Sequence, residues 1–199
     1  MNVRIAQLLS FNAASWFDGA VEMNQYTVKL WMITQSEDSL EQNIAFRRMK
    51  HFIYGELDST IFVDSELTDK CKELARAGFN ITTLPGDPSD QLIGIMLYHK
   101  INAIMENRIR LVEIEISAGD AVVYLHGENE TNESLIRPDW WESPDLTHSN
   151  LPSGSDNLIN IHPTTQWRDL ELSWPDSDEA NESGNTVVFA DFKKSDDTK

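Results

Sequence analysis

A break in composition at about Gly127 constrains the fold of this chain more than any other feature of its sequence. Every strongly periodic segment lies before the break, whereas residues 128–199 are dominated by Asn, Ser, Asp, Glu and Pro. Residues 1–127 carry 17 acidic and 11 basic side chains, and residues 128–199 carry 16 acidic and 5 basic ones. The sequence therefore predicts one compact domain over 1–127, followed by an acidic, partly ordered extension over 128–199.

Segments with strand and helix periodicity follow one another closely through the first domain. Ser39 and Gln42 have the spacing of a capping box at the start of a helix, and residues 15–24 are predicted as a loop too long for a tight hairpin turn. The predicted elements are strands at 3–14 and 25–34, helices at 39–54 and 67–77, a strand at 79–84, a helix from 87 or 89 to 106, and strands at 108–117 and 121–126. This order, β-β-α-α-β-α-β-β, predicts an α+β fold.

Charge and hydropathy exclude several classes of protein. The formal net charge of −17 repels phosphate backbones, so nucleic-acid binding is not expected. The longest apolar runs are far shorter than the ~20 residues of a membrane span, and the N-terminus lacks the apolar core of a signal peptide. A cytoplasmic location is therefore expected. The single cysteine, Cys71, excludes an internal disulfide and is predicted to be a structural thiol.

No intact catalytic motif is present. The sequence has no Gly-rich phosphate loop, no Gly-x-Ser-x-Gly and no Cys-x-x-Cys. None of its five histidines has the spacing of a metal ligand relative to another; they are His51, His99, His126, His148 and His162. Within the extension, two further short strands are predicted around 164–174 and 185–194. Trp140-Trp141 is predicted either to anchor a protein partner or to be buried in the chain's own core.

Five short segments, in this order, resemble the motifs of the 6-pyruvoyl- and 6-carboxy-tetrahydropterin synthase family. Residues 11–15 (FNAAS) stand where the family has Phe-Ser-Ala-Ala-His, and residues 22–26 (EMNQY) where it has His-Gly-His-Asn-Tyr. Leu-Asp-His, Pro-Thr-x-Glu-Asn and Val-x-Val-x-Glu-Thr correspond to residues 57–59 (LDS), 88–92 (PSDQL) and 112–117 (VEIEIS). The resemblance covers most of residues 3–126 and none of the extension.

This resemblance implies a particular architecture and assembly. Members of the family have the tunnelling fold (T-fold), in which a helix pair packs on one face of an antiparallel sheet. Their subunits join their sheets into a barrel, so the resemblance implies a homo-oligomer. It also implies a zinc-dependent carbon–oxygen lyase whose metal is held by three histidines.

The zinc positions of the family are replaced in this chain. Ser15, Glu22 and Asn24 stand where the three histidines would be, and Ser and Asn oxygens are weak zinc ligands. No zinc or other cofactor is therefore expected. A hard cation such as Mg²⁺ or Ca²⁺ on Glu22 and Asn24 is the alternative, and a polar loop hydrogen-bonded to itself is the preferred interpretation.

The other functional positions of the family are also changed. Asp18 stands in place of the catalytic cysteine and has no thiolate chemistry. The Asp-His pair becomes Asp58-Ser59, which keeps the carboxylate and loses the imidazole. The pterin-anchoring glutamate falls on Ile116, or on Glu115 if the register shifts by one residue, and the apolar alternation favours Ile116 facing the core.

Two functional hypotheses follow, and they leave enzymatic activity open. The first is a pseudoenzyme that acts as an oligomeric scaffold or interaction module, with the Trp-containing acidic tail contacting a protein partner. The second is a binder of, or enzyme on, a pterin- or purine-like small molecule at an inter-subunit pocket. Its polar groups would come from Ser15, Asp18, Glu22, Asn24, Asp58 and Glu115. The acidic and divergent composition suits a viral or mobile-element protein, such as one from a phage.

Overall fold

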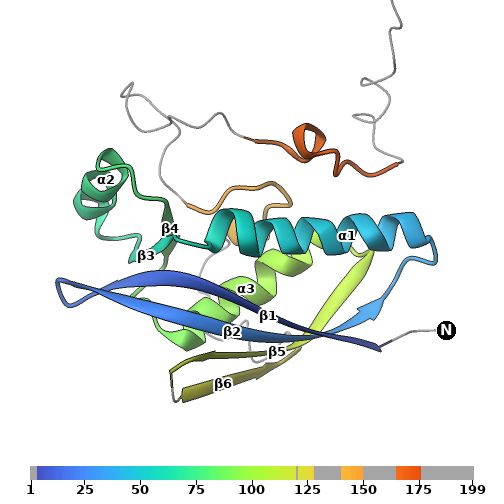
Figure 1. Cartoon of the computed structure of the whole chain (residues 1–199), viewed down its shortest axis with the longest axis horizontal. Coiled ribbons are helices and arrows are strands. Elements are labelled where there is room, and N and C mark those ends of the chain that lie inside the picture. The colour runs from blue at the N-terminus through green and yellow to red at the C-terminus, as the bar shows by residue number, and fades with distance from the viewer. Residues whose placement is uncertain (1–3, 120, 128–139, 150–164, 176–199) are drawn as a thin grey trace, which may run out of the picture.

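A computed structural model describes residues 4–119, 121–127, 140–149 and 165–175 (Figure 1). The elements are β1 (Arg4–Phe17), β2 (Ala20–Thr34), α1 (Ser39–His51), the π-helical η1 (Phe52–Leu57), β3 (Ile61–Asp64), α2 (Thr68–Arg76), β4 (Ile81–Leu84), α3 (Asp90–Met105), β5 (Ile109–Ala118), β6 (Ala121–His126) and the short 3-10 helices η2 (Trp140–Glu142) and η3 (Trp167–Leu170). The predicted α+β class is confirmed. No helix in the described part of the chain is long and apolar enough to cross a membrane.

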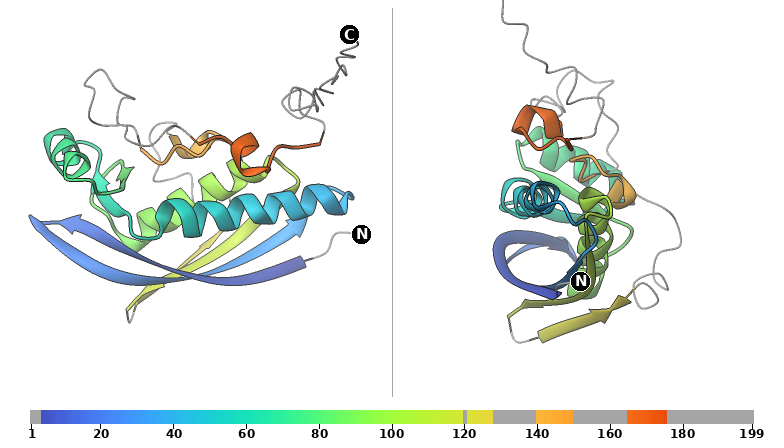
Figure 2. Two further views of the ribbon diagram at one scale, coloured as in Figure 1. Left: turned by 45° about the horizontal axis from the view of Figure 1, so that its top comes forward. Right: turned by 90° about the vertical axis from the view of Figure 1, so that its right-hand side faces the viewer.

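The six strands form one sheet in the order β4-β3-β1-β2-β5-β6. The pairs β1–β2, β2–β5 and β5–β6 are antiparallel, as predicted for the principal sheet. The short strands β3 and β4 extend it in the parallel sense beside β1. Helices α1 and α3 lie next to each other over one face of the antiparallel part (Figures 1 and 2).

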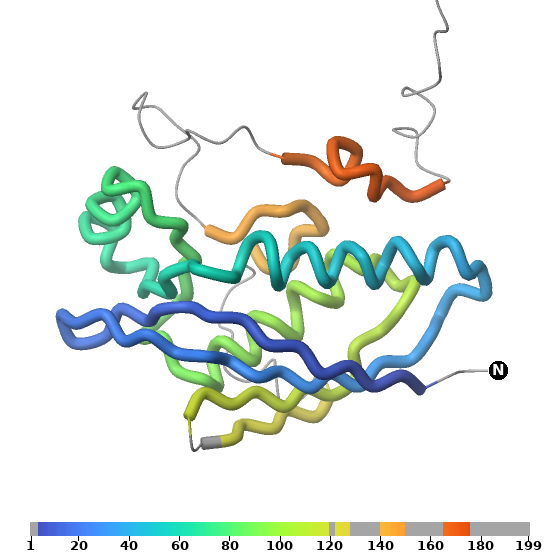
Figure 3. Tube along the Cα trace, viewed as in Figure 1, coloured from blue at the N-terminus to red at the C-terminus, as the bar shows by residue number. Residues whose placement is uncertain are grey.

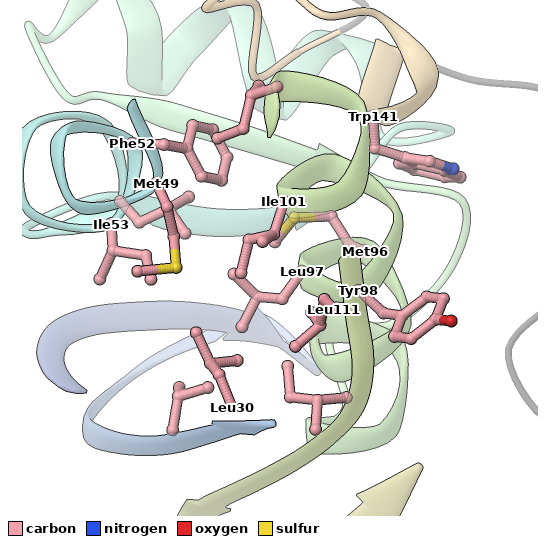
Figure 4. Close-up of a cluster of buried hydrophobic side chains, with 14 of the residues drawn as sticks. Leu30, Met49, Phe52, Ile53, Met96, Leu97, Tyr98, Ile101, Leu111 and Trp141 are labelled. Atoms are coloured by element: carbon pink, nitrogen blue, oxygen red, sulfur yellow. The ribbon is translucent and has the colours of Figure 1, made fainter. Parts of the chain in front are cut away.

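The main core lies between this helix pair and the sheet (Figure 4). Met49 of α1 and Phe52 of η1 meet Leu97 and Ile101 of α3 there, and Leu30 closes the cluster from β2. All five side chains are fully buried. Burying one such side chain contributes about 1.5–3 kcal/mol, so this layer is the main source of the domain's stability.

Helix α3 approaches the sheet most closely at Gly94. A Cβ atom added there would lie 3.1 Å from both the Cγ2 atom of Ile116 and the Cδ1 atom of Leu125. This distance is shorter than ordinary van der Waals contact, so glycine allows the helix to pack directly on β5 and β6.

The first two strands form a continuous hairpin, which corrects the predicted loop at 15–24. Fourteen residue pairs join β1 to β2 without interruption, from Arg4–Ile33 to Phe17–Ala20. The turn consists of Asp18 and Gly19, with φ of 47° and 79°. Asp-Gly is a strong signal for a two-residue turn with both φ values positive, and the sequence interpretation overlooked it.

Helix α1 begins one residue earlier than its predicted cap implies. Asp38, not Ser39, is the N-cap, and its carboxylate accepts a hydrogen bond from the Leu40 amide at 2.7 Å. At its other end α1 continues directly into η1, so the helical stretch ends at Leu57 rather than near Tyr54.

A second small core lies on the opposite face of β3, a strand that the predicted order lacks. Side chains alternate between the two faces of a strand, so Phe62 joins the main core while Ile61 and Val63 face away from it. Helix α2 covers these residues with Cys71 and Leu74. Cys71 is fully buried, and burial raises the pKa of its thiol, in accord with a structural role.

Two segments of the extension pack on the helices. Residues 140–149 and 165–175 lie on the side of the helix pair that faces away from the sheet (Figure 2). Trp140 and Trp141 are buried in the chain's own core, which is one of the two predicted alternatives. The strand predicted around 164–174 is replaced by η3 in its described part. The strand predicted at 185–194 lies outside the described residues.

Candidate functional site

The β1–β2 hairpin brings three of the predicted site residues onto one face. The register between β1 and β2 places Ser15 opposite Glu22 and Ala13 opposite Asn24. Because side chains alternate along each strand, Ser15, Glu22, Asn24 and Tyr26 all point to the face of the sheet that carries the helices.

Tyr26 is the centre of this group. Its hydroxyl lies 3.1 Å from the Ser15 Oγ atom and accepts a hydrogen bond from the Asn24 amide at 3.5 Å. The ring stacks on Phe11 and meets Phe62 edge-on, with centroid distances of 5.1 and 5.9 Å. Burial raises the pKa of Tyr26, and so its phenol stays protonated and serves as a hydrogen-bonding group.

Asp90 joins the group from the first turn of α3, and the sequence analysis missed it. Its negative charge adds to the effect of burial in raising the pKa of Tyr26. Burial also raises the pKa of Asp90 itself, while a hydrogen bond from the Ala118 backbone opposes that shift. The signal that could have identified it is its position directly after Ser89, the N-cap of the long helix.

Asp18 and Glu22 make none of the hydrogen bonds to Tyr26 given above, although the charge of Glu22 adds a small upward effect on the pKa of Tyr26. Asp18 occupies the exposed hairpin turn in the left-handed region. Glu22 is on the same face as Asn24 but is exposed near the end of the hairpin. The structure therefore brings together Ser15 and Asn24, and places Glu22 at their solvent side.

Asp58 serves the backbone of β1. Its Oδ1 atom accepts a hydrogen bond from the Asn12 amide at 2.9 Å, and the Ser59 amide donates to the Asn12 carbonyl oxygen at 2.6 Å. These two bonds continue the ladder that β3 makes with Ala14 and Ser15. Asp58 therefore supplies a hydrogen bond to the backbone of β1 just beyond the two residues that β3 pairs.

Glu115 lies on the opposite face of the sheet from Tyr26. It stands across from Lys29 on β2 and Tyr124 on β6. Its neighbour Ile116 is fully buried in the main core, which confirms the register in which Ile116 and not Glu115 faces the helices.

The Ser15, Asn24, Tyr26 and Asp90 group offers hydrogen bonds and one carboxylate. It does not fit a zinc ion, because a serine hydroxyl and an amide oxygen are poor ligands and both side chains are already bonded to Tyr26. Among the described residues, no three His, Cys, Asp or Glu side chains are arranged to hold a metal ion.

A second surface stands out on the outer sheet face, defined as the face of β1, β2, β5 and β6 that points away from α1 and α3. Four large apolar side chains are exposed on it: Leu8 at 69%, Val21 at 47%, Met23 at 72% and Val122 at 62%. Charged residues are interspersed among them. Glu113 accepts hydrogen bonds from Tyr124 at 2.8 Å and Arg4 at 2.9 Å, and these contacts lower its pKa.

Comparisons with known proteins give a partial likeness. No family model and no curated protein matches the chain. Similar solved structures include an uncharacterised protein of Wolinella succinogenes, with 13% identity and a TM-score of 0.48 over 64% of this chain and 99% of that one.

Two other similar structures are 6-pyruvoyl tetrahydropterin synthases. The Plasmodium vivax enzyme has 13% identity and a TM-score of 0.40, over 63% of this chain and 98% of its own. The Plasmodium falciparum enzyme has 13% identity and a TM-score of 0.37 over the same shares. Likeness at this level assigns no activity, substrate or metal to the present chain.

Proposed function

We propose that this protein is a non-catalytic, tunnelling-fold-type protein that acts as an oligomeric scaffold or interaction module. The observation that carries this proposal is the outer sheet face, where Leu8, Val21, Met23 and Val122 are exposed together. Large apolar side chains left exposed on one sheet face are a feature of interaction surfaces. Copies of the chain are the proposed partners, since closing the sheets of several copies into a barrel would turn this face inward and enclose it.

The polar group on the hairpin supports the non-catalytic part of the proposal. Ser15 and Asn24 are both bonded to the hydroxyl of Tyr26, and Asp58 is bonded to a backbone amide. Side chains engaged in this way stabilise the fold, and none of them supplies a thiolate or an imidazole for proton transfer.

The assembly is tested by native mass spectrometry and light scattering on the full chain. The expected result is a homo-oligomer that Leu8→Glu dissociates, because a buried carboxylate on the sheet face would be strongly disfavoured. Leu40→Glu is the matched control, because Leu40 is an exposed leucine on α1, away from the sheet face. A native chain that is monomeric at all concentrations would overturn the proposal.

A second candidate function is binding of a pterin- or purine-like molecule, and Asp90 favours it. Such rings carry N–H groups that can donate hydrogen bonds to a partly buried carboxylate. Asp90 is bonded to the backbone of Ala118, the residue that pairs with Tyr26 in the sheet. A thermal-shift screen with pterins and purine nucleosides tests it, together with metal analysis of the purified protein. Stabilisation of the native chain that is lost in Asp90→Asn would favour binding, and no shift with any heterocycle would exclude it.

A further inference from the structure

The described segments of the extension, residues 140–149 and 165–175, together form what we call the strap. Figure 3 shows both running along the helix pair, in orange and red, on the side away from the sheet. Trp167 ties them together, since its indole N–H donates to the Pro144 carbonyl at 2.6 Å. The surface beneath the strap has three recognition features, each built from different elements.

The first feature is the outer edge of β4, the last strand on its side of the sheet. The Thr83 amide donates to the carbonyl oxygen of His148 at 3.3 Å, and the Thr83 carbonyl accepts the indole N–H of Trp140 at 2.9 Å. Strand edges present backbone groups of this kind to any extended chain that can pair with them. The strap therefore occupies the β4 edge by a backbone bond and an aromatic side chain.

The second feature is Lys100, a fully buried lysine of α3. Its ammonium donates to the carbonyl oxygens of Ser143 at 2.9 Å and Trp140 at 3.4 Å, and lies 5.4 Å from the Trp140 ring centroid. The nearest carboxylate, Asp145 of the strap, is 3.7 Å away and mostly exposed. Strap carbonyls and an indole ring thus replace the water that would surround this cation.

The third feature is Arg48, a buried arginine of α1. Its Nε atom donates to the Leu172 carbonyl at 2.8 Å, and its guanidinium lies 3.9 Å from the Trp174 ring centroid and 4.8 Å from that of Trp167. Arginine on an indole face is a favourable cation–π arrangement. The second strap segment therefore repeats the recognition used by the first.

The surface beneath the strap selects one kind of occupant. It offers two cations and a strand edge, and it receives indole rings, backbone carbonyls and a carboxylate. We propose that β4, Lys100 and Arg48 form a docking groove for an acidic, tryptophan-bearing extended segment. In this chain the strap fills the groove in cis, and the same segment of a second copy occupies it when the strap is released.

Burial of Lys100 beneath the closed strap opposes protonation of its amine. Burial lowers the pKa of Lys100 to about 8, and the charges of Asp145 and Glu56 oppose that shift only in part. His148, whose pKa burial lowers, also faces Glu56 at 3.5 Å, as does His51 at 3.6 Å. A protonated Lys100 makes closure of the strap less favourable, because burial disfavours its charge. The chain's own strap nevertheless competes well against the strap of a second copy, because it is tethered and so has a high effective concentration.

A second copy is the occupant because its strap is chemically identical. Every strap contact described above for Thr83, Lys100 and Arg48 can be made by the same strap residues of another chain. Exchange of the strap between copies does not require assembly through the outer sheet face, and the second test below is run in chains where Leu8→Glu disables that assembly.

The first test uses the full chain with Trp140→Ala and Trp167→Ala, which weaken the native strap. The probe is a fluorescent peptide with the sequence of residues 140–149. We expect the released variant, folded by circular dichroism, to bind the peptide at least tenfold more tightly than the native chain does. A peptide carrying Trp140→Ala is the matched control and is expected not to bind. Equal binding by the native and released chains, or binding by neither, would overturn the proposal.

A second test keeps the native strap and so does not depend on that variant's folding. Equal amounts of ¹⁵N-labelled and unlabelled chains, both carrying Leu8→Glu, are treated with a carbodiimide that joins Lys100 to Asp145. Exchange between copies predicts mixed-isotope crosslinks whose fraction rises with protein concentration. Crosslinks between residues of the same isotope alone, at every concentration, would contradict exchange, whatever the outcome for sheet assembly.

Discussion

At the scale of single residues, the two buried cations differ in how well their charge is compensated. Arg48 has a carboxylate partner, Glu106, at 2.7 Å and donates to two backbone carbonyls as well. Lys100 has carbonyl oxygens close by, but its nearest carboxylate is 3.7 Å away and solvated. A buried charge that is only partly compensated is costly, so Lys100 is the residue whose protonation responds to the strap.

Closure of the strap is expected to strengthen as pH rises from about 8 towards 10. The pKa of Lys100 is lowered from 10.5 to about 8 in the closed form, and an exposed lysine keeps its ordinary value. Between these values the open form holds a proton that the closed form lacks, so raising pH favours closure. Below pH 8 both forms are protonated and closure is at its weakest.

This pH dependence is measured by hydrogen exchange of residues 140–149, corrected for the intrinsic exchange rate. Protection should increase by up to about tenfold per pH unit within the window. Lys100→Met has no titrating group and should show a flat profile. The same slope in Lys100→Met would show that another group controls the strap.

Replacing Arg48 is expected to destabilise the protein strongly. Arg48→Met leaves Glu106 and the Leu172 carbonyl without their donor, and should lower the free energy of unfolding by about 2–4 kcal/mol. Urea denaturation measures the change. Arg47→Met, at an exposed position on the same helix, is the control and should fall within about 0.5 kcal/mol of the native chain. Similar losses in both variants would contradict a specific role for Arg48.

At the scale of elements, the start of α1 distinguishes between two neighbouring candidates for the N-cap, Asp38 and Ser39. Asp38 accepts the Leu40 amide at 2.7 Å, whereas Ser39 is the first residue of the helix. Asp38→Ala should therefore cost about 1 kcal/mol of stability, and Ser39→Ala should cost little. Thermal unfolding of the two variants provides the comparison. A larger loss in Ser39→Ala would restore the cap predicted from the sequence.

At the scale of the whole molecule, the strap adds a third layer to the sheet and the helices. Its tryptophans and leucines belong to the main core cluster; they are Trp140, Trp141, Leu146, Trp167, Leu172 and Trp174. A chain that ends at Gly127 should consequently unfold at a lower temperature and bind hydrophobic dyes. A chain that ends at Pro175 keeps both strap segments and is the matched control. Equal melting temperatures for the two would show that the strap contributes nothing to stability.

The boundary at Gly127 and the assembly belong to this scale as well. The separation into residues 1–127 and 128–199 stays a prediction, and the described strap segments share the core of the first part. Homo-oligomerisation rests on the exposed outer sheet face. Both are settled by the truncation and mass measurements above.

The sequence by itself determined the positions of most strands and helices and the direction of many side chains. Alternation in 108–117 correctly placed Ile116 towards the helices, because the period of a strand depends on adjacent residues alone. The same reasoning missed β3, which has only the four residues Ile61–Asp64 between two helices. It also missed the Asp18-Gly19 turn, although the local signal for that turn was present.

Tertiary structure alone decided which polar groups meet. Asp58 binds the Asn12 amide, 46 positions away, and Arg48 binds the Leu172 carbonyl, 124 positions away. Such pairs have no spacing that a sequence pattern can reveal, because they depend on the packing of whole elements against one another. Gly127 marks a change in composition, yet the chain beyond it returns to cover Lys100 and Arg48. The carbonyl oxygens and indole rings that cover these two cations reach them only when both parts fold together.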